Sequence, residues 1–163
     1  MRRYAAAFAA VMALGLVAAA CSDSDETASP TGGGTTPATS PTATPTSFGD
    51  ASTFLLTAGD QSSDGKTLTI DQAVFNGQNG FVAIHSDAGG APGPVIGVTD
   101  LLNAGTHDDI TITLTQPLEA SATVFPMLHT DSDKDGKYTF PGPDGPAMVG
   151  GKVVVFPIKI TVA

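Results

Sequence analysis

The sequence contains one cysteine, no tryptophan and, apart from Arg2 and Arg3, no arginine. A single cysteine excludes an internal disulfide, so the fold cannot rest on the cross-links found in many small exported domains. Without arginine, the chain after residue 3 lacks a bidentate donor for phosphate or carboxylate groups. Its five lysines stand against sixteen acidic residues, which gives that part a net charge of −11. We therefore expect no binding of nucleic acid, because such binding needs a basic surface.

Motifs of catalysis are missing as well. The sequence has no Gly-x-Ser-x-Gly turn, no cysteine nucleophile within the folded part and no glycine loop that cradles phosphate before a helix. The run from Gly89 to Pro94 has proline at two positions where backbone N–H groups would be needed for such a cradle. The sequence therefore predicts no catalytic residues and a protein that is not an enzyme.

The N-terminus has the three parts of an export signal. Two arginines precede an apolar run over residues 5–20, which is too short and too rich in alanine for a membrane-spanning helix. The small residues before Cys21 resemble the bacterial lipobox, in which the cysteine is lipidated. This resemblance implies a signal peptide over 1–20 and a lipid on Cys21 that anchors the protein in the cell envelope, at the cell membrane or the outer membrane. The alternative is an ordinary signal peptide cut nearby, with Cys21 a free thiol.

Residues 21–49 are predicted to form a disordered linker. Thr, Ser, Pro and Gly dominate, and apart from alanine and proline no apolar side chain follows Cys21 until Phe48. Such a segment buries too little surface to offset its ordering entropy, and its prolines favour a stiff spacer. This spacer would hold the rest of the chain away from the membrane.

Residues 50–163 are predicted to form one all-β domain. Apolar and polar residues alternate over 66–75 and 110–114, and turn-forming residues separate further apolar runs at 81–85, 95–98, 122–129 and 153–162. About seven short strands favour a small antiparallel β-sandwich of the immunoglobulin-like kind, with a small barrel as the alternative. Thr99–Asn103 is predicted as one helical turn. Because Pro157 cannot donate to a ladder, 153–162 is predicted as an edge strand.

Several segments of this domain resemble an uncharacterised family. They are Ser63–Ile70, Gly80–His85, Val95–Val98, Leu102–His107 and Thr111–Leu114, followed by His129, an Asp-rich turn and Tyr138. Together they are similar to a domain of unknown function found in secreted surface proteins of halophilic archaea and in some bacterial lipoproteins. The resemblance implies a β-sandwich on a cell surface and no known reaction.

The acidic turn that begins at Asp131 predicts a calcium site. Carboxylates at positions 1, 3 and 5 and glycine at position 6 reproduce the opening of a calcium-binding loop. The usual acid at position 12 is missing, because Gly142 stands there, so a later acid or a neighbouring loop would have to complete the shell. The predicted ligands of Ca²⁺ are Asp131, Asp133, Asp135, the carbonyl of Lys137, and Asp144. The alternative is a polar loop whose acids only add solubility.

The three histidines predict a second kind of metal site. Each is followed two residues later by aspartate, and a nearby carboxylate is what orients a metal-bound imidazole. His107, Met127 and His129 form the set for an alternative function, an envelope carrier of copper or zinc, since His/Met sets suit copper. We expect His85 at the opposite end of the sandwich from His107 and His129. The competing interpretation is three strand-end histidines bonded to local groups.

The leading prediction combines these parts. It is a lipid-anchored surface module that binds or supports other components and catalyses nothing. Its partners would be the membrane, through the lipid on Cys21, and an unknown protein or surface.

Overall fold

The computed structural model describes residues 44–163. The predicted signal peptide, Cys21 and the predicted linker as far as residue 43 lie outside this part of the chain. No helix long and apolar enough to cross a membrane occurs among residues 44–163. The linker prediction is wrong at its C-terminal end, because Thr46–Gly49 already pair with the strand that follows.

Eleven strands form the described part of the chain, in place of the seven or so expected. They are β1 (Thr46–Asp50), β2 (Phe54–Ala58), β3 (Gln61–Ser63), β4 (Thr67–Phe75), β5 (Gly80–Asp87), β6 (Pro92–Val98), β7 (Gly105–Thr113), β8 (Ala122–Thr130), β9 (Met148–Val149), β10 (Lys152–Val153) and β11 (Ile158–Val162).

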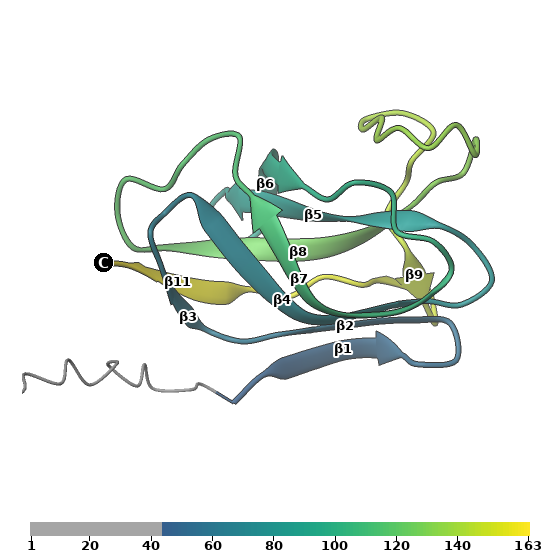
Figure 1. The fold of residues 1–163 in the computed structure, drawn as a ribbon, viewed down its shortest axis with the longest axis horizontal. Helices are drawn as coiled ribbons and strands as arrows, with labels where there is room; N and C mark the ends of the chain where they lie inside the picture. Colours follow the sequence, from purple (N-terminus) through teal and green to yellow (C-terminus); the bar gives the residue numbers. More distant parts are fainter. Residues whose placement is uncertain (1–43) are drawn as a thin grey trace, which may run out of the picture. The chain divides into compact units, whose positions relative to one another are not determined.

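The strands form two main sheets and a short hairpin (Figure 1). One sheet has the order β1-β2-β4-β7, the other has the order β3-β11-β8-β5-β6, and β9 pairs with β10. If β2, β4 and β7 are equated with strands A, B and E of an immunoglobulin domain, then β6, β5, β8 and β11 follow the order C′-C-F-G. The predicted all-β sandwich of the immunoglobulin-like kind is therefore confirmed.

The main core lies between the two sheets. In the four-stranded sheet, Leu68 pairs with Ile112 and Ile70 with Ile110, so the alternation read from the sequence puts these apolar side chains on one face. The other sheet contributes the buried residues Val82, Ile84, Val124, Leu128, Ile158 and Ile160 to the same cluster. Burial of these side chains from both sheets holds the layers together.

Two local predictions are wrong. Thr99–Asn103 forms no helical turn, because Leu102 exchanges two backbone hydrogen bonds of 2.9 Å with Gly80 at the start of β5. The Thr99 hydroxyl instead accepts the N–H of Val82 at 3.1 Å. The last strand is not at an edge either, since β11 lies between β8 and β3. Pro157, which cannot donate, comes one residue before β11.

Both faces of β5 and β8 are buried. Alternate residues point into the core between the sheets, and the remaining ones point to the outer face of the five-stranded sheet. The outer-face residues are buried although they lie outside the main core cluster: Phe81, Ala83, His85, Phe125, Met127 and His129. A further part of the chain must therefore cover this outer face.

Candidate functional site

The segment that follows β8 covers the outer face. Its Tyr138 ring lies 5.4 Å from the ring of Phe81 and 5.2 Å from that of His129, measured between ring centres. The Phe140 ring lies 4.7 Å from the ring of His129 and 6.1 Å from that of His85. We call residues 131–147 the cover loop; Figure 1 shows it as the light green loop beside the start of β5.

The cover loop carries an acidic cluster. One carboxylate oxygen from each of Asp131, Asp133 and Asp144 lies within 4.8 Å of the others. Asp131 directly follows β8, where its N–H donates to the Asn79 carbonyl at 3.0 Å. Asp131 and Asp144 are buried, whereas Asp133 is exposed. The chain thus folds back on itself, so that Asp131 and Asp144, thirteen positions apart in the sequence, lie close together.

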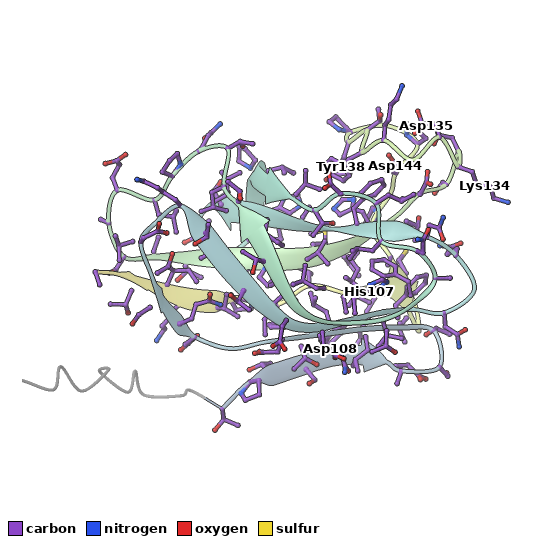
Figure 2. The ribbon with its side chains drawn as sticks, in the orientation of Figure 1. His107, Asp108, Lys134, Asp135, Tyr138 and Asp144 are labelled. Atoms are coloured by element: carbon purple, nitrogen blue, oxygen red, sulfur yellow. The ribbon has the colours of Figure 1, made fainter. Side chains whose placement is uncertain are left out.

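Asp144 ties the two ends of the acidic turn together. Its Oδ1 accepts the N–H of Ser132 at 3.2 Å, and its Oδ2 accepts the N–H of Thr139 at 2.6 Å. Figure 2 shows Asp144 beside Tyr138, at the base of the turn that carries Lys134 and Asp135. Because Asp144 is fully buried, its carboxylate holds the turn from the inside.

Asp131 has a buried carboxylate oxygen that no donor in the described part of the chain satisfies. It is 5 % exposed, and its Oδ1 is the one buried side-chain oxygen or nitrogen in residues 44–163 that lacks a hydrogen-bond partner. A buried carboxylate oxygen without a donor is costly, and two further carboxylates nearby increase the cost. Asp131 also lines an open hollow of ≈ 500 Å³ together with Asn79 and Leu101. A cation that enters here would compensate the charge that the fold gathers.

One predicted calcium ligand lies elsewhere in the turn. Asp135 is outside the cluster of three acids, and its Oδ1 accepts the N–H of Lys137 at 2.8 Å. That contact closes the turn where Gly136 takes a φ of 72°, a left-handed conformation that glycine adopts without strain. The structure therefore brings together Asp131, Asp133 and Asp144.

The histidines are arranged differently from the prediction. His85 and His129 meet, with 3.4 Å between their Nε2 atoms, although they lie 44 residues apart in sequence. His107 is in β7 of the other sheet, where its ring Nε2 bonds to the Asn103 carbonyl at 2.8 Å. No cluster of three metal-ligating acidic or histidine side chains within 44–163 includes His107. The expected separation of His85 from His129 is wrong, because neighbouring strands β5 and β8 carry them on the same face.

Burial sets the charge states around this pair. Desolvation lowers the pKa of His129, while the hydrogen bond to the Asp144 carbonyl acts in the opposite direction. Desolvation also raises the pKa of Tyr138, and the charge on Asp144 adds to that rise. At neutral pH the site therefore holds a neutral His129 imidazole and a protonated Tyr138 phenol.

Sequence reasoning missed the contributions of His85, Tyr138 and Phe140. A usable signal was present in the apolar runs 81–84 and 124–128, which do not alternate with polar residues. Such runs indicate strands buried on both faces. A second covering layer therefore follows from these runs, but the residues that provide it do not.

Comparisons with known proteins place the domain in a family. Residues 55–161 match the model described as "Domain of unknown function (DUF7282)". In Haloarcula hispanica, "Cell surface glycoprotein 2" is 40% identical over 114 residues and "Cell surface glycoprotein 1" is 37% identical over 113 residues. These alignments cover 70% and 69% of this chain but 12% of each relative. No solved structure matches the chain. The chain therefore belongs to the DUF7282 family, a family of domains of unknown function.

Proposed function

We propose that the protein is a lipid-anchored module of the cell surface that is not an enzyme and whose cover loop binds Ca²⁺. Two relatives named as cell surface glycoproteins support the location. The lipobox-like sequence before Cys21 supports the anchor. The buried, unpartnered Oδ1 of Asp131 carries the calcium assignment, because Asp131 lies in a cluster with two further carboxylates.

The chemistry of the cluster suits calcium. Ca²⁺ takes six to eight hard oxygen ligands at about 2.3–2.6 Å in a flexible geometry, whereas Mg²⁺ demands a near-ideal octahedron. Asp131, Asp133 and Asp144 provide three carboxylates, and the exposed position of Asp133 leaves room for water molecules. Such an ion would join the end of β8 to Asp144 and so fix the cover loop over the outer face.

Calcium is therefore expected to stabilise the folded protein. At a free Ca²⁺ concentration about 100 times the Kd, the free energy of unfolding should rise by about 2.7 kcal/mol, because the ion binds the folded state alone. Calorimetric titration of the full chain should give binding heat, and the melting temperature should rise in parallel. Asp133→Asn should abolish both effects with little change of the calcium-free fold, since Asp133 is exposed.

Asp135→Asn is the matched control. It removes the same charge from the same turn, but from a residue outside the cluster, so it should retain the calcium response. Equal responses of the Asp133→Asn and Asp135→Asn proteins would contradict the proposed ligand set. If calorimetric titration of the wild-type protein with Ca²⁺ gave no binding heat, the proposal that the cover loop binds calcium would be wrong.

The lipid anchor is tested separately in cells. Cys21→Ala should release the protein from membranes after a high-salt wash, because the acyl chains would be lost while surface charge contacts are screened. Ser22→Ala, which keeps the cysteine, should remain in the membrane fraction and incorporate labelled fatty acid. Retention of the Cys21→Ala protein after the wash would contradict the anchor.

A further inference from the structure

The hydrogen bonds of His85 and His129 determine which ring nitrogens carry protons. Nδ1 of His85 lies 2.7 Å from the Gly93 carbonyl oxygen, and Nδ1 of His129 lies 2.9 Å from the Asp144 carbonyl oxygen. A carbonyl oxygen only accepts, so both Nδ1 atoms must donate. In neutral imidazoles, both Nε2 atoms then carry lone pairs and no proton. Two lone pairs therefore face each other across 3.4 Å in a buried place.

The two rings meet tip to tip. Their planes differ by 14°, and their centres are 5.7 Å apart, much farther than the 3.4 Å between the Nε2 atoms. The rings therefore extend along the sheet toward each other and are not stacked face to face. The register explains this: Phe81 pairs with His129 and His85 with Phe125, so one row lies between the histidines. That row is Ala83 paired with Met127.

The row between the histidines combines a small side chain with a sulfur ligand. Ala83 has the smallest side chain that a non-glycine residue can place there, so it adds little bulk between the two ring tips. Met127 shares the outer face with His129 and is 7 % exposed, so its thioether belongs to the same buried layer. Two imidazoles and a thioether form a soft donor set.

We propose that His85, Met127 and His129 bind one Cu(I) ion beneath Tyr138 and Phe140 of the cover loop. Two nitrogen ligands at about 2.0 Å from one ion and about 120° apart would be about 3.5 Å from each other. The observed separation is 3.4 Å. A three-coordinate ion displaced from the line between the tips toward Met127 fits this spacing once each ring tilts by roughly 30°, so that its Nε2 lone pair points at the ion. The hydrogen bonds from Nδ1 to the two carbonyls hold the ligands in the metal-binding tautomer.

The surroundings favour Cu(I) over a proton or Zn²⁺. Burial of both rings disfavours an imidazolium. Zn²⁺ prefers four ligands, and a buried divalent charge costs more desolvation than a monovalent one. Around the pair stand the rings of Phe81, Phe140 and the protonated Tyr138, whose hydroxyl lies 3.5 Å from Nε2 of His129. In this ligand set His85 takes the place of His107, which the sequence had suggested. The copper site does not require calcium, because Asp144 contributes to it only through its backbone carbonyl, which accepts the hydrogen bond from His129.

The test is a competition for Cu(I) in the full chain. Cys21→Ser is used as the background, because the one thiol of the sequence would itself bind Cu(I). The protein competes, without oxygen and with Ca²⁺ present, against the coloured Cu(I) complex of bicinchoninate. We expect one ion bound per chain. His85→Gln, His129→Gln and Met127→Leu should each weaken binding at least about 10- to 100-fold, the loss seen when even outer partners of a metal site are removed.

His107→Gln is the matched control and should bind as the background protein does, because His107 lies in the other sheet. Met127→Leu nearly conserves volume, so it tests the site even if a buried histidine variant unfolds. Circular dichroism verifies the fold of each variant. The proposal is overturned if no ion binds, if the folded Met127→Leu protein binds as tightly as the background, if His107→Gln alone loses binding, or if Zn²⁺ binds in preference to Cu(I).

Discussion

Gly80→Ala is expected to lower the free energy of unfolding by about 3 kcal/mol or more, at the upper end of overpacking substitutions. A Cβ atom at this position would overlap with the backbone oxygen of His129 and with the ring of Phe75. Neither neighbour can yield easily. The oxygen belongs to β8, and the ring is fully buried in the core. The strands β5 and β8 would have to separate, which would also misplace His85 relative to His129.

Chemical denaturation of the purified protein measures this loss directly. Gly145→Ala is the matched control, because a Cβ there meets nothing within 4 Å and its backbone lies outside the left-handed region. The control should change stability by less than about 0.5 kcal/mol. If the Gly80→Ala protein were as stable as the control, β5 and β8 would not approach each other as closely at this position as the contacts of Gly80 indicate.

Asp144→Ala is expected to destabilise the calcium-free protein by about 3 kcal/mol. Its carboxylate accepts two backbone N–H groups, from Ser132 and Thr139, and each hydrogen bond to a charged group contributes about 1.5–3 kcal/mol. Local opening of the cover loop to water would limit the loss below the full sum. The substitution removes the inner attachment of the loop, so the outer face of β5 and β8 should become accessible.

Hydrogen exchange gives the sharpest readout for this variant. With a calcium chelator present, the amides of Ser132 and Thr139 should lose protection in the Asp144→Ala protein, together with amides of the cover loop. Asp133→Ala removes an exposed member of the same cluster and should cost less than about 1 kcal/mol under the same conditions. If both variants were equally stable, Asp144 would contribute no more than any surface acid.

The sequence was a good guide where only one face of a strand is buried. In 110–114 the inward residues are Ile110, Ile112 and Leu114, and threonines alternate with them toward solvent. Such alternation identifies the buried face without ambiguity, because a shift of the strand register by one residue would expose every apolar side chain to water. The all-β sandwich followed from several such segments. Pro157 misled, because a residue just before a strand does not restrict how many neighbours the strand has.

The sites depend on contacts that local patterns do not encode. His85 and His129 meet because of the pairing register of β5 and β8, and Ala83 between them is an ordinary residue in the sequence. The acidic turn was recognisable from its spacing, and Asp144 was expected as a later ligand, but the cluster omits Asp135. Its geometry depends on how Asp144 binds the backbone of the turn, and spacing alone says nothing of that.

The position of β1 has a mechanical consequence. Both ends of the described domain lie at the same end of the sandwich, and β1 is an edge strand that forms its strand pairing with β2 alone (Figure 1). Tension between the two ends therefore acts across the strands and breaks the β1–β2 bonds one pair at a time, beginning where Thr46 pairs with Ala58. The five residues of β1 would release roughly 17 Å of chain. Because β11 is paired with both β8 and β3, the rest of the sandwich would stay folded. Release of β1 would therefore lengthen the chain under tension while the core remains intact.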